Sequence, residues 1–131
     1  MKIKLAKSEL IHFVGIGGIG MSGLALIMKS KGFKVQGSDI SNNKNIERLR
    51  KEKIKVFIGH KKQNIEKGTI LVISSAIKKN NPEFVAAKIK QLPIYKRGEM
   101  LANIVSLTKN IVVVGSPVSY THLTLPTTPY V

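Results

Sequence analysis

Short, nearly continuous apolar runs alternate along the chain with longer segments in which apolar residues recur every three or four positions. Short runs bounded by glycine or polar residues are typical of buried strands, and the longer spacing is typical of helices with one buried face. The pattern predicts strands at residues 10–14, 34–37, 55–58, 69–74, 93–95 and 110–114. It predicts helices at 19–31, from Ser41 or Asn42 as the cap to about 53, from Pro82 to about 90, and at 98–107.

This alternation of strands and helices predicts an α/β fold: a Rossmann-like parallel sheet with helices on both faces. Right-handed connections between parallel strands give a sheet order of about 3-2-1-4-5, with the first strand in the centre. In such a sheet the chain changes direction between the first and fourth strands. Ligands bind in the crevice beyond the carboxyl ends of the strands at that point.

A glycine-rich turn follows the first strand and opens the first helix. Gly15, Gly17 and Gly20 have the G-x-G-x-x-G spacing, which lets backbone N–H groups approach a diphosphate at a helix N-terminus. Asp39 follows the next strand, where an acid in folds of this kind contacts a ribose hydroxyl. A turn residue without a ligand is the alternative for Asp39.

The segment Ser74-Ser75-Ala76-Ile77 follows the fourth strand and should face the glycine turn across one site. Ser74 and Ser75 offer hydroxyl or backbone hydrogen bonds to a phosphate or base, or are simply polar residues at a strand end. His60 ends the third strand and either reaches the site or lies in a surface turn. His12 is expected to be a hydrogen-bonded core residue. These residues have no metal-ligand spacing, so no metal site is expected.

Composition narrows the class of protein. The 131 residues are 43% hydrophobic, which is enough for a core and excludes a disordered composition. There is no cysteine, no apolar run long enough to span a membrane, and no secretory signal pattern, so we expect a cytoplasmic protein. The net charge of +15 comes mostly from dispersed lysines, and aromatic residues make up only 5%. This pattern favours a solvated surface suited to an anionic small ligand over specific nucleic-acid binding.

The composition changes abruptly at residue 116. Residues 116–131 contain no Lys, Arg, Asp or Glu and hold three of the five prolines. We expect this segment to be a non-native or disordered tail, and we exclude it from the fold.

Several segments together resemble the N-terminal domain of the Mur ligases, and among them the UDP-N-acetylmuramate–L-alanine ligases of peptidoglycan synthesis. The resemblance rests on His12–Gly23, Gly37-Ser38-Asp39, Ile58-Gly59-His60, Ser74–Ile77 with Asn81-Pro82-Glu83, and Arg97–Leu101. It implies that residues 1–108 form a domain that binds a UDP-sugar rather than NAD. It further implies that the UDP-sugar contacts Gly15, Gly17, Gly18, Gly20, Met21, Ser22, Asp39, His60, Ser74, Ser75 and Ala76.

The resemblance also implies ATP and Mg²⁺ as cofactors of the longer enzymes and L-alanine as the second substrate. Residues 109–115 look like the start of the ATP-binding central domain, with Gly115 as the remnant of its phosphate loop. The family continues from there with Gly-Thr-His-Gly-Lys-Thr-Thr, whereas this chain continues Ser116-Pro117-Val118. The lysine that reaches the terminal phosphates is therefore missing, and we expect this chain alone to bind UDP-N-acetylmuramate weakly and not to ligate.

Three other functions remain open from the sequence. Asp39 suits an NAD-binding module equally well, and only Met21-Ser22 with Ser74–Ile77 argue against that class. The Mur-type ligase that recycles murein tripeptide shares the same fold. A basic binding module without enzymatic activity is the third alternative.

Overall fold

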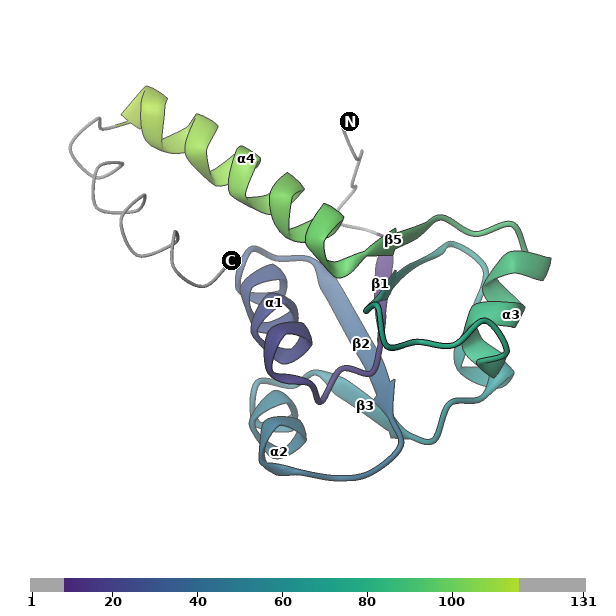
Figure 1. Cartoon of the computed structure of the whole chain (residues 1–131). Helices are drawn as coiled ribbons and strands as arrows, with labels where there is room; N and C mark the ends of the chain where they lie inside the picture. Colours follow the sequence, from purple (N-terminus) through teal and green to yellow (C-terminus); the bar gives the residue numbers. More distant parts are fainter. Residues whose placement is uncertain (1–8, 116–131) are drawn as a thin grey trace.

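The computed structural model describes residues 9–115, and the side chains among them as far as residue 106. Five strands form one all-parallel sheet in the order β3-β2-β1-β4-β5, which confirms the predicted topology (Figure 1). The strands are β1 (Leu10–Val14), β2 (Lys34–Asp39), β3 (Lys55–Ile58), β4 (Thr69–Ile73) and β5 (Ile94–Lys96). The helices are α1 (Ile19–Ser30), α2 (Lys44–Lys51), α3 (Pro82–Ile89) and α4 (Arg97–Gly115), with a short 3₁₀ turn, η1, at Lys62–Asn64.

Helices cover both faces of the sheet (Figure 1). On one face Ile11 and Phe13 of β1 pack in the larger apolar cluster, which includes residues of α1, α2 and α4 such as Met28, Leu49 and Met100. On the other face a smaller cluster joins the sheet to α3. Successive strand residues point to opposite faces, so β1 contributes to both clusters.

The face toward α3 is unusual because its centre is polar. His12 of β1 lies in register with Gln36 of β2, and Val14 lies in register with Ser38. His12, Gln36 and Ser38 are all buried. Burying polar groups is costly unless they are hydrogen-bonded. The partners of these three side chains therefore matter for the site described below.

Two helix caps have clear causes. Asn43 caps α2 by accepting a hydrogen bond from Ile46 N at 3.0 Å, so the cap is one or two residues later than the predicted Ser41 or Asn42. Asn81 caps α3 by accepting from Glu83 N at 2.9 Å, and Pro82 occupies the first turn as predicted. Proline is favoured there because its missing N–H would have no partner within the helix.

The strand predicted at 110–114 is wrong, because these residues belong to α4, which runs from Arg97 to Gly115. No proline or glycine interrupts the sequence between Gly98 and Gly115. A β-branched run favours a strand only where a neighbouring strand can pair with its backbone, whereas a helix satisfies its backbone groups internally. The helix that begins at Arg97 therefore continues through the apolar run. The expected tail at 116–131 lies outside the described residues.

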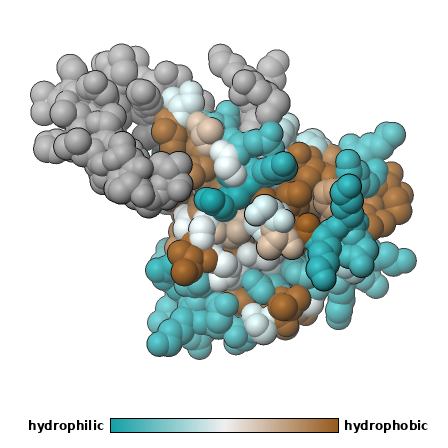
Figure 2. Space-filling view, viewed as in Figure 1, coloured by the Kyte–Doolittle hydropathy of each residue, from teal (hydrophilic) through white to brown (hydrophobic). Residues whose placement is uncertain are grey.

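Hydrophilic side chains are spread over the visible surface, from α2 toward α3, and alternate with apolar patches (Figure 2). Within the described part of the chain, no helix is both long and apolar enough to cross a membrane.

Candidate functional site

The glycine turn between β1 and α1 is fixed to the end of β2. Gly15 has a φ of +83°, a conformation that glycine adopts without strain. The backbone N–H groups of Gly15 and Ile16 both donate to the carbonyl oxygen of Ser38, at 2.8 and 2.9 Å. The turn therefore has one defined conformation at the carboxyl end of the sheet, where ligands of such folds bind.

Asp39 holds the middle of this turn. Its Oδ2 accepts a hydrogen bond from Gly17 N at 2.7 Å, and its Oδ1 accepts from Ile40 N at 2.7 Å. A Cβ added to Gly17 would lie 2.6 Å from Asp39 Oδ2, so a larger residue there would displace the Asp39 carboxylate. The sequence suggested that Asp39 contacts a ribose or base. In the structure its carboxylate bonds to the turn and its side chain also borders the cavity described below.

The N-terminus of α1 is open to an anionic ligand. Its N-cap residue is Gly18, no side chain caps it, and its first turn holds no acidic residue. Gly18 and Gly20 are both exposed. The first N–H groups of a helix have no partner within the helix and carry a partial positive charge. This terminus therefore retains the donors that a diphosphate needs.

Arg97, which the sequence did not mark as a binding residue, adds a full positive charge beside this terminus. A Cβ built on Gly20 would lie 3.2 Å from Cζ, Nε and Nη1 of Arg97. The guanidinium group therefore lies over the first turn of α1, where planar donors suit a phosphate. Only its position in the resembling segment Arg97–Leu101 could have drawn attention to it.

Met21 and Ser22 point away from this opening. Their residues are 3% and 0% exposed, and Ser22 Oγ donates to Ile19 O within the helix. Ser22 N donates to Gly18 O. Of these two residues, only Met21 therefore has a backbone N–H in the first turn of α1 that can bind a ligand.

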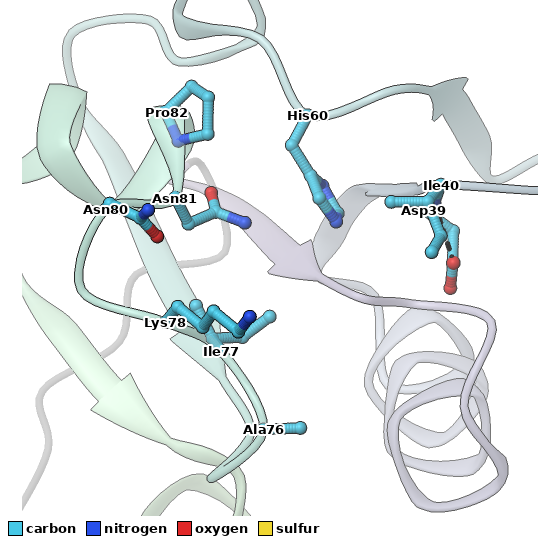
Figure 3. A pocket seen from close by; sticks show the side chains of 9 residues that line it. All are labelled: Asp39, Ile40, His60, Ala76, Ile77, Lys78, Asn80, Asn81 and Pro82. Atoms are coloured by element: carbon cyan, nitrogen blue, oxygen red, sulfur yellow. Dashed lines mark hydrogen bonds between the residues drawn. The ribbon is translucent and has the colours of Figure 1, made fainter.

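A cavity of about 550 Å³ opens beside the glycine turn (Figure 3). Three predicted site residues line it: Asp39, His60 and Ala76. The remaining lining residues are Ile40, Ile77, Lys78, Asn80, Asn81 and Pro82. In the close-up, Asp39 and Ile40 lie on one side of the opening, with Ile77 and Lys78 across from them (Figure 3). His60 lies between Asn81 and Asp39 (Figure 3). Such a volume suits a small molecule, and Lys78 supplies a further cation.

The two segments expected to face each other across the site do so. Ile77 Cδ1 lies 3.7 Å from the position of a Cβ on Gly15. Ser74 instead shapes the turn, because its Oγ accepts from Ala76 N at 3.3 Å and its carbonyl oxygen accepts from Ile77 N at 3.2 Å. Ser75 is exposed, and neither serine borders the cavity.

The buried carboxylate of Glu83, in α3, binds residues that lie next to the cavity. Its Oε1 accepts from His12 Nε2 at 2.8 Å and from Ser38 Oγ at 2.5 Å. Its Oε2 accepts from Asn64 Nδ2 at 2.6 Å and from Lys61 N at 3.1 Å. These four donors come from β1, β2, η1 and the loop before η1, so Glu83 ties α3 to the polar centre of the sheet. The prediction that His12 is a hydrogen-bonded core residue is confirmed.

Burial alone would raise the pKa of Glu83, but its surroundings outweigh burial. The hydrogen bonds that Glu83 accepts from His12, Ser38 and Asn64 hold this pKa below the usual value for glutamate. Glu83 is therefore an ionised carboxylate at neutral pH.

The described residues contain no group of three or more His, Asp or Glu side chains that would hold a metal ion. They also do not fit an ATP phosphate loop, because Gly115 ends α4 instead of following a strand. What the site offers is a helix N-terminus, two cations and an imidazole beside a cavity, which suits an anionic ligand with polar groups.

Comparison with known proteins shows which family model, relatives and solved structures the chain resembles. Residues 10–109 match the family model described as "Mur ligase family, catalytic domain". The chain is 78% identical over 116 residues to the UDP-N-acetylmuramate–L-alanine ligase of Pelagibacter ubique, covering 88% of this chain and 25% of that protein. The chain thus spans about a quarter of the length of this relative.

Two solved structures share the fold. One is a UDP-N-acetylmuramate–alanine ligase from Thermotoga maritima, with 37% identity and a TM-score of 0.72 over 75% of this chain and 23% of that one. The other is a UDP-N-acetylmuramate:L-alanyl-γ-D-glutamyl-meso-diaminopimelate ligase from Neisseria meningitides, with 30% identity and a TM-score of 0.64 over 68% of this chain and 28% of that one.

Proposed function

Because this chain belongs to the Mur ligase family, we propose that it holds the UDP portion of UDP-N-acetylmuramate for the ligation of L-alanine in peptidoglycan synthesis. In the longer enzymes of the family, ATP with Mg²⁺ supplies the energy for forming the amide bond. The residues of this chain bind and orient the nucleotide-sugar before the amide bond is formed.

The observation that carries the proposal is the open N-terminus of α1 with the Arg97 guanidinium beside it. A diphosphate at this terminus would accept hydrogen bonds from backbone N–H groups of the first turn and would face a full positive charge. The cavity bordered by Asp39, His60 and Ile77 then lies within reach of the nucleoside end. Residues 1–108 act in this proposal as the substrate-holding domain.

L-alanine as the second substrate is proposed from the relative at 78% identity. Likeness to the murein tripeptide ligase is weaker, at 30% identity. An NAD-binding module remains the alternative that experiment must separate, since the glycine turn alone suits either diphosphate.

Calorimetric titration of the 131-residue chain with UDP-N-acetylmuramate, and separately with NAD, tests the proposal. We expect saturable binding of UDP-N-acetylmuramate and at least tenfold weaker binding of NAD. Equal or tighter binding of NAD, or no binding of UDP-N-acetylmuramate, would contradict it.

A further inference from the structure

The hydrogen bonds around Glu83 determine where the protons lie on two histidines. The amide nitrogen of Gln36 contacts His12 Nδ1 at 2.8 Å and donates to the carbonyl oxygen of Asn64 at 3.2 Å. An amide nitrogen only donates, so His12 Nδ1 must accept and carries no proton. His12 is therefore the neutral Nε2–H tautomer, and its one N–H points to Glu83 Oε1.

The same reasoning applies to Ser38 and His60. Ser38 Oγ lies 2.5 Å from Glu83 Oε1 and 2.8 Å from His60 Nδ1. A serine hydroxyl has one hydrogen, and Glu83 is an ionised acceptor, so Ser38 donates that hydrogen to the carboxylate. Ser38 Oγ must then accept from His60, which requires a proton on His60 Nδ1.

The other ring nitrogen of His60 faces the cavity side. His60 lines the cavity, its side chain is 13% exposed, and among the described residues no hydrogen-bond partner is found for its Nε2. In the neutral ring with Nδ1 protonated, Nε2 carries a lone pair and only accepts.

We infer that Glu83, acting through Ser38, holds His60 in the Nδ1–H tautomer, so that His60 Nε2 accepts a hydrogen bond from an N–H or O–H group of the nucleoside bound in the cavity. This inference deepens the proposed function and rests on it for the identity of the ligand. It gives Glu83 and Ser38 the role of positioning residues, and it makes His60 a contact that selects for a donor group, such as a ribose hydroxyl or a pyrimidine imide.

Nitrogen-15 spectra of the imidazole rings test the tautomer in the chain without ligand. We expect His60 Nδ1 to show the shift of a protonated nitrogen and Nε2 that of an unprotonated one at pH 8. In Ser38→Ala the Nδ1–H loses its acceptor, so we expect the Nε2–H form to become populated. A wild-type ring protonated on Nε2, or a spectrum unchanged in Ser38→Ala, would overturn the inference.

Two substitutions at His60 test the contact with the ligand. Asparagine places an N–H donor near the position of Nδ1 but offers no acceptor at Nε2, whereas the longer glutamine can bring its amide oxygen toward Nε2. We expect His60→Asn to bind UDP-N-acetylmuramate about tenfold more weakly, as the loss of one hydrogen bond predicts, and His60→Gln to recover part of that loss. Thermal melting confirms that both variants fold.

The outcomes separate the two proposals. If wild type binds UDP-N-acetylmuramate and His60→Asn binds it equally well, the inference is wrong and the proposed function stands. If wild type does not bind this ligand, the proposed function is wrong, and the nitrogen spectra still decide the tautomer.

Discussion

Glu83 shows how a carboxylate can be buried in a small domain when both of its oxygens are fully hydrogen-bonded. Its carboxylate is fully enclosed, and four donors satisfy its two oxygens. Burying an isolated carboxylate would cost many kcal/mol, so this set of donors must be complete for the fold to tolerate it. The completeness of the set also orders the residues that donate to it, including Ser38 behind the cavity.

Glu83→Gln should destabilise the chain by about 1–3 kcal/mol at neutral pH. The amide offers one acceptor oxygen where two carboxylate oxygens accepted four bonds, and its own N–H groups oppose the donors. Chemical denaturation of both proteins measures the difference in unfolding free energy.

The difference in unfolding free energy between wild type and Glu83→Gln should depend on pH. The folded-state pKa of Glu83 lies below its usual value, so its stabilisation is fully present above ~4.3, the ordinary pKa of glutamate, and is lost as the pH falls through the lowered pKa. The gap between wild type and Glu83→Gln should therefore narrow below pH ~4.3. A gap that widens in acid would contradict this account of Glu83.

Gly37 and Gly23 differ in how closely neighbouring atoms pack against them, so alanine substitutions at the two positions can be compared. A Cβ on Gly37 would lie 2.5 Å from Ile16 Cδ1 and 2.7 Å from Phe13 O, whereas a Cβ on Gly23 meets nothing within 4 Å. We expect Gly37→Ala to destabilise by about 1–3 kcal/mol. Gly23→Ala, within α1, should stabilise by about 0.5–1 kcal/mol. Thermal melting of both variants checks the prediction, and equal melting temperatures would contradict it.

At the scale of elements, the site depends on how helix ends meet at one edge of the sheet. The N-terminus of α1 lies against Arg97, the first residue of α4, and α3 brings Glu83 beneath the end of β2. The helices α1, α3 and α4 thus contribute residues of their first turns to the site, where unpaired N–H groups or a cap are found. Ligand binding should be sensitive to charge at these ends.

Arg97→Met should weaken binding of UDP-N-acetylmuramate about tenfold or more, because it removes a charge-assisted contact to the diphosphate. Lys88→Met removes the same charge from an exposed position of α3 and should leave binding unchanged. Calorimetry at two salt concentrations measures both variants. Equal weakening of binding by the two substitutions would show that Arg97 does not contact the diphosphate.

Predictability from the sequence differed between these elements. Apolar runs and glycine positions were enough for the sheet order and the turn at Gly15, because those signals are local. The run at 110–114 was misread as a strand, because a β-branched segment takes the helical form when the helix before it is not interrupted. The network of Glu83 could not be read from the sequence, since its partner His12 lies 71 positions away.

At the scale of the whole molecule, the chain spans about a quarter of the length of the relatives it matches. Its proposed part in the reaction is to hold the substrate. The 131-residue polypeptide carries no Gly-Lys-Thr after Gly115, so we expect it to release no phosphate from ATP in the presence of UDP-N-acetylmuramate and L-alanine. A phosphate-release assay measures this, and turnover by the polypeptide alone would contradict the prediction.

Backbone amide resonances of the chain, followed during titration with UDP-N-acetylmuramate, show directly whether the ligand binds at the N-terminus of α1. We expect saturable shifts at Gly17, Gly18, Gly20 and Met21 and at His60, with no shift at Lys88 on the outer part of α3. Shifts confined to other surfaces, or the same shifts produced by NAD and not by UDP-N-acetylmuramate, would contradict it.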